Sequence, residues 1–249
     1  MRKIAVALSK GGVGKTTTAV NLSAGLAKLG YHILLIDMDT QGQAAQALGI
    51  KAKIGLAELA CGARSIEQTV LQARDGLWLL AGGRELAGLK REIARKDFGS
   101  ERTISDALKP LDGRFDYVII DTAPGWDSLT INALFYATEV IAPVALESMA
   151  LQGLREFGVS LSAIQRFHQR LGLNYILPTF MDRRVKKSQQ IYDLLMEYYH
   201  ARVCDPIRYN VRLSEAPGLG KTIFEYDSRS AGAEDYQSLV SRILEDEVD

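Results

Sequence analysis

A glycine-rich loop near the start of the chain has the composition of a phosphate-binding site. It reads SKGGVGKTT over residues 9–17. Glycines let backbone N–H groups converge on phosphate oxygens, and a helix that begins near Thr16 adds partial positive charge at the same place. In such a loop Lys15 reaches the β- and γ-phosphates, and the Thr16 hydroxyl ligates Mg²⁺. The sequence therefore predicts a site for a nucleoside triphosphate with magnesium.

The segments on either side of this loop support that prediction. Residues 3–8 are apolar and indicate a buried strand, and residues 16–28 repeat apolar side chains at helical spacing. A strand, a glycine loop and a helix in that order are the context that a phosphate-binding loop requires. The strict pattern G-x-x-x-x-G-K-[ST] departs at Ser9, which stands at the first glycine position. A solvated glycine-rich turn is the alternative, and the flanking elements disfavour it.

Aspartates stand at the ends of two further apolar strands. Asp37 and Asp39 come at the end of the run 32–37, where the period of two places both side chains on one side. Asp121 ends the run 116–121. Carboxyl ends of parallel strands lie on the ligand side of a sheet, and Asp121 is typical of a Walker B element that holds Mg²⁺. Carboxylates that merely form turns are the alternative.

The turn that follows Asp121 contains a second candidate for phosphate contact. It reads TAPG over residues 122–125. We expect the N–H of Gly125 to donate to the γ-phosphate, so that loss of this phosphate on hydrolysis releases the loop. A strand followed by a proline turn without a ligand is the alternative. The prediction of phosphate contact is supported only by the presence of the glycine loop and the aspartates elsewhere in the chain.

Length and composition limit the class of protein. The chain has 249 residues, of which 30 are basic and 30 acidic, and 47% are hydrophobic. These values suit one large α/β domain over residues 1–249. Because the charges cancel, binding to nucleic acid requires a local basic patch. Cys61 and Cys204 form no metal-binding motif, and we see neither a signal peptide nor a membrane span. We therefore expect a cytoplasmic protein.

The rest of the chain alternates strands and helices. This alternation predicts an α/β fold, with a mostly parallel twisted sheet and helices on both faces. We expect further strands at 77–80, 139–146 and 173–180, short helices broken by Gly62 over 54–75, a short helix at 212–216, and longer helices at 84–96, 102–111, 128–137, 151–171, 187–202 and 230–246.

The loop with its additional lysine, Lys10, resembles the deviant Walker A box of the ParA/MinD family of P-loop ATPases. The segment NVRLSEAPGLGK over residues 210–221 looks very like the C-terminal segment of the chromosomal and plasmid ParA branch. With the aspartate boxes, the resemblance covers nearly the whole chain. It departs at Thr40 and Gln43, where the family usually has Pro and Asn.

The resemblance implies a P-loop NTPase fold that hydrolyses ATP with Mg²⁺ in an ATP-dependent homodimer. It implies that Lys10 reaches the nucleotide of the partner subunit, that Asp39 positions the attacking water and that Asp37 lies closer to the metal. The predicted site residues are Lys10, Lys15 and Asp39 for catalysis, Gly11, Gly12, Val13, Gly14, Lys15, Thr16, Thr17, Gly125, Met181, Pro206 and Asn210 for the nucleotide, and Thr16, Asp37 and Asp121 for the metal.

A basic run at residues 183–187 is the densest positive segment of the chain. Lysine and arginine near phosphates release counterions, which gives sequence-independent and salt-sensitive binding. The resemblance implies non-specific contact with double-stranded DNA through Arg184 and Arg212. A solvated helix start is the alternative. The predicted DNA-binding residues are Arg184, Lys186, Lys187, Arg208 and Arg212.

The implied function is that of a partition or positioning ATPase associated with the nucleoid. A ParB-like or cargo-adaptor protein would stimulate hydrolysis and release the dimer from DNA, so that a chromosome, plasmid or protein cargo is moved. A MinD-like ATPase on the membrane is one alternative, disfavoured by the acidic end of the chain over 240–249. An ATP-dependent amidoligase or synthetase of related fold is the other, and we see no dedicated substrate domain for it.

Overall fold

Continuously apolar strands form the centre of the sheet. A computed structural model describes residues 1–246 of the chain. Its central strands are β2 (Ile33–Asp37), β5 (Tyr117–Asp121), β1 (Arg2–Val6) and β6 (Glu139–Ala145), in that spatial order. All five residues of β2 and of β5 are buried, because helices cover both faces of the sheet. The full order is β3-β4-β2-β5-β1-β6-β7, and every neighbouring pair is parallel except β3 with β4. This arrangement confirms the predicted fold class.

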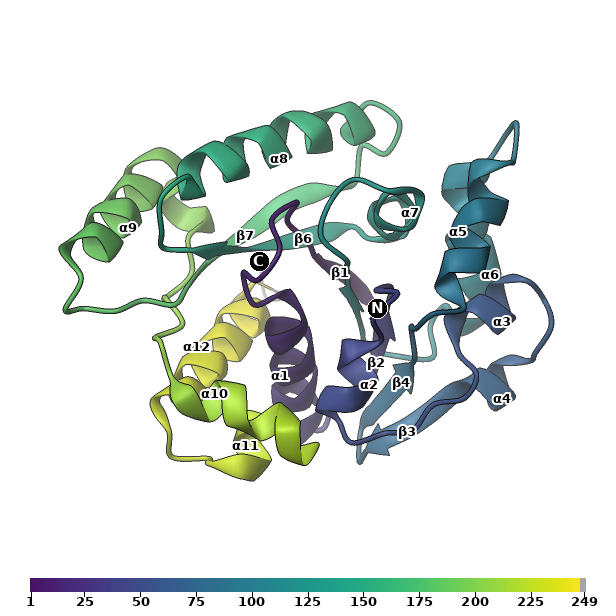
Figure 1. Cartoon of the computed structure of the whole chain (residues 1–249), viewed down its shortest axis with the longest axis horizontal. Coiled ribbons are helices and arrows are strands. Elements are labelled where there is room, and N and C mark those ends of the chain that lie inside the picture. Colours follow the sequence, from purple (N-terminus) through teal and green to yellow (C-terminus); the bar gives the residue numbers. More distant parts are fainter. Residues whose placement is uncertain (247–249) are drawn as a thin grey trace.

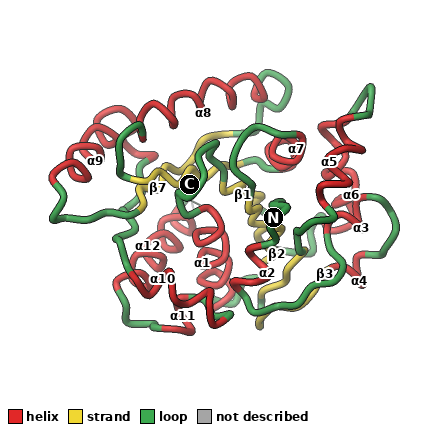
Figure 2. Tube along the Cα trace, viewed as in Figure 1, coloured by secondary structure: helices red, strands yellow, loops and turns green. Residues whose placement is uncertain are grey.

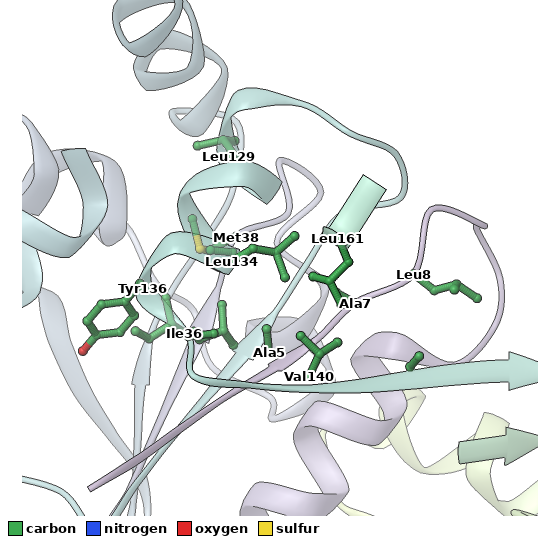
Figure 3. Packing of buried hydrophobic residues seen from close by; sticks show 14 of the residues in the cluster. Ala5, Ala7, Leu8, Ile36, Met38, Leu129, Leu134, Tyr136, Val140 and Leu161 are labelled. Carbon is green, nitrogen blue, oxygen red and sulfur yellow. The ribbon is translucent and has the colours of Figure 1, made fainter. Parts of the chain in front are cut away.

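Helices lie on both faces of this sheet, as Figures 1 and 2 show. One apolar cluster joins the sheet to α1, α2 and α12, and the other joins it to α5, α6, α7 and α8. Figure 3 shows part of the second cluster, where Leu134 and Leu161 lie near Ala5 and Val140 of the sheet. The helices are α1 (Lys15–Lys28), α2 (Gln43–Ala47), α3 (Leu56–Ala60), α4 (Ile66–Thr69), α5 (Leu86–Ala94), α6 (Thr103–Leu108), α7 (Ser128–Tyr136), α8 (Ala150–Gln165), α9 (Lys186–Tyr199), α10 (Val211–Glu215), α11 (Ile223–Tyr226) and α12 (Ala231–Glu245).

The segment 54–75 differs in part from the prediction. Its first part forms α3 and α4, on either side of Gly62, as expected. Residues Val70–Arg74 are not helical but form β3, which pairs antiparallel with β4 (Leu77–Leu80). The turn between these strands is Asp75-Gly76, and Gly76 has a φ of 69°. Asp-Gly between two apolar stretches is a hairpin signal, and it outweighs the helical spacing here.

Several helices are shorter than predicted. The helix expected over 151–171 ends at Gln165, because the chain turns there and the His168 ring bonds to the Ala137 carbonyl at 2.7 Å. The helix expected over 187–202 ends at Tyr199, and His200, with a φ of 44°, starts a 3-10 turn. Of the acidic end over 240–249, residues 247–249 lie outside the described part. Within residues 1–246, none of the helices has the length and apolar character needed to cross a membrane.

The carboxyl ends of the parallel strands bring the predicted site together. β1 leads into the glycine loop, β2 ends at Asp37, β5 ends at Asp121, and β7 (Gly172–Thr179) ends beside Phe180. In the sheet register Asp121 lies beside Val6 on one side and Asp37 on the other. Residues from four distant parts of the sequence therefore meet at one edge of the sheet.

Candidate active site

The glycine loop wraps around the amino end of α1. Gly12 and Gly14 have φ values of 71° and 90°, a backbone conformation that favours glycine. The Lys15 ammonium donates to the Lys10 carbonyl at 2.8 Å, which fixes the lysine across the loop. Burial lowers the pKa of Lys15, while the nearby Asp121 and Asp39 carboxylates oppose this shift. The ammonium is thus held next to carboxylates at the head of the helix, where a phosphate would meet it.

Asp37 and Asp121 form a buried pair of carboxylates. Both side chains are fully buried, and they lie side by side in adjacent strands. Burial raises the pKa of Asp37 to about 6, although N–H groups of Asp39 and Ala44 donate to its two oxygens at 2.9 and 3.0 Å. Burial, with the Asp37 carboxylate, also raises the pKa of Asp121 well above its ordinary range, and the Thr16 side chain opposes that shift. Two buried carboxyl groups side by side would be stabilised by a bound cation.

A magnesium ion fits this donor set. Neither oxygen of Asp121 has a hydrogen-bond partner of normal geometry in residues 1–246. A buried polar group without a partner is costly, and an oxygen-seeking cation would satisfy it. The described residues include no group of three or more His, Cys, Asp or Glu side chains suited to a metal. Mg²⁺ does not need one, because it keeps several waters and takes one or two carboxylates together with substrate phosphates.

Asp39 begins the turn between β2 and α2. Its side chain accepts from the Gln41 N–H at 2.9 Å, and its carbonyl accepts from the N–H groups of Gly42 and Gly83 at 3.1 Å each. Gly82 lies even closer, since a Cβ built there would lie 2.7 Å from the carbonyl oxygens of both Asp37 and Asp39. The sequence indicated Asp39 but missed the role of Gly82, although a Gly-Gly pair at the end of a strand is a signal for close backbone approach.

The turn over residues 122–125, the second candidate for phosphate contact, is bound to strand β1 and the glycine loop that follows it. The Gly125 N–H donates to the Ser9 carbonyl at 3.0 Å, and the Thr122 hydroxyl donates to the Val6 carbonyl at 2.9 Å. Gly125 was predicted to donate to a γ-phosphate. In this structure its N–H has another acceptor, so that contact requires the bond to Ser9 to break.

Lys10 also has a partner within its own chain. Its ammonium pairs with the Glu147 carboxylate, in the loop after β6, and both side chains are exposed. Glu147 could not be predicted as this partner from the sequence, because the pairing depends on β6 lying next to β1 in the sheet.

Two of the cavities at the head of α1 are lined by glycines of the loop. The larger, about 630 Å³, is lined by Gly11, Gly12, Gly14, Lys15, Thr16, Thr17, Asp39, Lys90, Pro124 and Asp127, among others. The smaller, about 240 Å³, is lined by Gly14, Thr17, Phe180, Ile207, Tyr209, Asn210, Leu213 and Tyr236, among others. The larger suits a polyphosphate and the smaller, which is more apolar, suits a flat ring system.

The residues predicted around the base are only partly in place. Asn210 lines the smaller cavity, whereas Met181 and Pro206 do not. The Met181 side chain is buried in the core, and its backbone pairs with Arg208. Neighbours of these two residues, Phe180 and Ile207, line the smaller cavity instead. Phe180 follows the end of β7 with a φ of 57°, so the chain bends there.

The predicted DNA-binding residues lie in different environments. The exposed Arg184 pairs with Asp182 at 2.8 Å, Lys186 is exposed, and Lys187 donates to the Ser148 hydroxyl. Arg212 is exposed and pairs with Glu215 at 3.1 Å.

Arg208 differs from the expected exposed cation. It pairs with Asp235 at 2.7 Å and with Glu234 at 2.9 Å, and it lines the smaller cavity. We therefore assign Arg208 a structural ion pair rather than a place on a basic surface.

Comparison with known proteins gives consistent matches. Residues 1–175 match the AAA-domain family. The chain is 39% identical to the chromosome-partitioning ATPase Soj of Thermus thermophilus over 98% of this chain and 96% of that protein. It is 37% identical to the sporulation initiation inhibitor protein Soj of Bacillus subtilis over 96% of this chain and 97% of that protein.

A solved structure adds a different name. The chain is 31% identical to cobyrinic acid a,c-diamide synthase from Mycobacterium smegmatis with bound ADP and magnesium, with a TM-score of 0.84. The match covers 98% of this chain and 94% of that one. The two folds therefore agree over nearly their whole lengths.

Proposed function

The chain belongs to the ParA/Soj family of partition ATPases, and we propose that it binds DNA and positions a cargo by hydrolysing ATP. It is an ATPase that uses ATP and Mg²⁺. We further propose that one domain over residues 1–249 contains the whole site. The observation that carries the proposal is the buried Asp37–Asp121 pair next to the Lys15 ammonium.

In the proposed mechanism the chain's own groups bind and orient the triphosphate. Backbone N–H groups of residues 11–17 and the Lys15 ammonium hold the phosphates, while Asp39 orients the attacking water. Thr16, Asp37 and Asp121 would hold the magnesium ion, which would supply positive charge to compensate the phosphates. Asp39 does not need to be a strong base, because phosphoryl transfer depends mainly on alignment and charge compensation. The adenine ring would lie in the smaller cavity beside Asn210 and Leu213.

We propose that two subunits close over two nucleotides, with Lys10 of each reaching the phosphates of the other. Lys10 would first leave Glu147, its partner within the chain. Closure joins the basic residues of both subunits, and two weak patches on one rigid body gain affinity from effective concentration. The residues that support a DNA-binding surface are Arg184, Lys186, Lys187 and Arg212.

Hydrolysis would then separate the subunits and release them from DNA. In this proposal a ParB-like or cargo-adaptor protein stimulates hydrolysis, so that the protein accumulates on the nucleoid away from its cargo. The Soj proteins named above, partitioning and sporulation proteins, support this reading.

One experiment tests the proposal directly. ATP turnover and mass by light scattering are measured with and without non-specific double-stranded DNA, each with ATP, ADP or no nucleotide. We expect a doubled mass with ATP alone and retention on DNA only in that state. A monomer with ATP, or retention that ignores the nucleotide, would contradict the proposal.

A synthetase is the second candidate, because the Mycobacterium smegmatis structure bears such a name. An enzyme of this class activates a carboxylate with ATP, so its turnover depends on an acid substrate and an amine donor and is indifferent to DNA. The same assay separates the two functions.

A further inference from the structure

Arg74, at the end of the edge strand β3, contacts two segments that are distant in sequence, the end of α2 and the C-terminal segment that contains Gly220 and Glu225. Its Nε donates to Glu225 Oε1 at 2.6 Å, in α11. Its Nη2 donates to the Gly220 carbonyl at 2.9 Å and to the Leu48 carbonyl at 3.2 Å. A planar guanidinium with five donors can hold several acceptors at fixed angles, which an ammonium cannot do. Arg74 thus joins the end of α2 to the C-terminal segment.

The first of these segments leads to the metal site. Leu48 is the residue directly after α2, whose five residues begin at Gln43. At the other end of α2 the Ala44 N–H donates to Asp37 Oδ2 at 3.0 Å, and this bond is buried. One short helix therefore extends from the Arg74 guanidinium to the Asp37 carboxylate. A displacement of its far end would move the N–H that orients Asp37.

The second segment leads to the smaller cavity. Gly220 closes the 3-10 helix Ala216–Leu219, which follows α10, and Leu213 of α10 lines that cavity. This 3-10 helix packs against α2. Gly49 and Gly220 touch through their backbones, since a Cβ on Gly220 would lie 2.6 Å from the Gly49 Cα. Arg74 donates to the carbonyls on both sides of this contact.

We propose that Arg74 is a positioning residue for the active site, because it fixes α2, and through α2 the Asp37 carboxylate, against the segment that lines the base cavity. The inference rests on the proposed placement of magnesium beside Asp37. It assigns a role in the reaction to a side chain that lines neither of these two cavities and lies at the opposite end of α2 from Asp37.

The test is the dependence of ATP turnover on magnesium concentration, measured at saturating ATP. For Arg74→Ala we expect the half-saturating Mg²⁺ concentration to rise about 10-fold, the size typical of lost support behind a metal ligand. The affinity for ADP without magnesium should stay close to that of the wild type. Arg74→Lys should resemble Arg74→Ala, because the fork of donors rather than the charge is needed.

Two further variants make the result decisive. Arg95→Ala is the matched control, because the exposed Arg95 side chain has no hydrogen bond or ion pair with any other described residue, and its Mg²⁺ dependence should be normal. Glu225→Gln should shift the dependence the same way by a smaller factor, since the carbonyl contacts of Arg74 remain, and it decides the matter if Arg74→Ala fails to fold.

Two results would overturn the inference in distinguishable ways. If the folded variants are less heat-stable but keep the wild-type Mg²⁺ dependence, Arg74 only stabilises the fold and the proposed function stands. If the wild type itself turns over ATP without magnesium, the proposed metal site fails together with the inference.

Discussion

The ammonium of Lys10 forms an ion pair with the carboxylate of Glu147 in the same chain. Lys10 belongs to the glycine loop after β1. Glu147 belongs to the loop after β6, the strand next to β1 in the sheet. A lysine that is to reach a second subunit must first lose this partner. Because both side chains are exposed, the pair is weak, on the order of 0.2–1 kcal/mol. It can therefore hold Lys10 in the free subunit without preventing its transfer.

We expect Lys10→Ala to abolish ATP-dependent association and turnover, because it removes the cation that is proposed to reach the partner's phosphates. Lys15→Gln should abolish both as well, by removing the cation of the subunit's own loop. Light scattering with a slowly hydrolysed ATP analogue measures the association. Wild-type association by Lys10→Ala would refute the assignment of this lysine.

Glu147→Gln should act in the opposite direction to Lys10→Ala. With its competing carboxylate removed, Lys10 is free, and we expect association at an analogue concentration about two- to fivefold lower than for the wild type. A titration of mass against analogue concentration gives this number. Asp106→Asn removes an exposed carboxylate that pairs with Lys109 far from the loop and should leave the titration unchanged.

Asp121→Asn should stabilise the metal-free protein and abolish its activity. The Asp121 carboxyl is fully buried, and within residues 1–246 neither of its oxygens has a hydrogen-bond partner of normal geometry, so the neutral amide removes the cost of burying a charge there. We expect a gain of roughly 2 kcal/mol in unfolding free energy at pH 7.5, measured by thermal or urea unfolding in a chelator. A variant less stable than the wild type would contradict the description of this pair.

The same pair predicts how stability depends on pH. A carboxyl whose folded pKa is raised stabilises the fold below its unfolded pKa, near 4, and this contribution is lost as the pH rises through the folded pKa. For Asp37 that value is about 6. The metal-free wild type should therefore lose stability between about pH 4 and pH 7. Unfolding curves across this range should show that Asp121→Asn loses less stability than the metal-free wild type. The wild type with Mg²⁺ and nucleotide should also lose less stability than the metal-free wild type.

Gly82→Ala should slow turnover through the backbone of Asp37 and Asp39. The added Cβ would lie 2.7 Å from both carbonyl oxygens, so the turn with Asp39 must shift. Misplacement of about 1 Å costs up to 100-fold in rate, and we expect a loss of about 10- to 100-fold in kcat. Gly88→Ala in α5 is the control, because nothing lies within 4 Å of its Cβ. It should keep full activity and gain a few tenths of a kcal/mol in stability.

Arg212→Glu should weaken retention on DNA while ATP binding stays normal. Its exposed guanidinium contacts the surface residues Glu215, Tyr226 and Asp227, and such exposed contacts are weak enough to be exchanged for a phosphate. The slope of log affinity against log salt should fall by about one. Arg208→Ala should lower thermal stability instead, by about 2 kcal/mol, because it breaks the pair with Asp235. Normal gel retardation of DNA by Arg212→Glu at moderate salt would contradict the assignment of Arg212 to a DNA-binding surface.

Local patterns sufficed for the central strands and the phosphate loop. Continuous apolar runs such as 33–37 and 117–121 are typical of buried strands, and both form them. Glycines and a lysine directly before a helix are typical of a phosphate-binding loop. Asp37 and Asp121 were predicted from their places at strand ends. Their adjacency followed from the parallel order of strands, which the alternation of elements already indicated.

Contacts between distant segments could not be read in the same way. Glu147 beside Lys10, and Arg74 beside Leu48 and Gly220, depend on which strands become neighbours. Arg208 was misjudged because sequence does not show that Asp235 of α12 would face it. β3 was missed because Val70–Arg74 is half-buried at the edge and lacks the strong apolar run of an inner strand.

The two margins of the sheet restrict how copies of the chain can come together. At one margin β3 runs antiparallel and its register shifts between Gln72 and Arg74. At the other, residues 203–209 line the later part of β7 through bridges at Val203 and Arg208. Bulged or covered margins do not template further strands. Growth into an open-ended fibre through the addition of strands at these margins is therefore disfavoured.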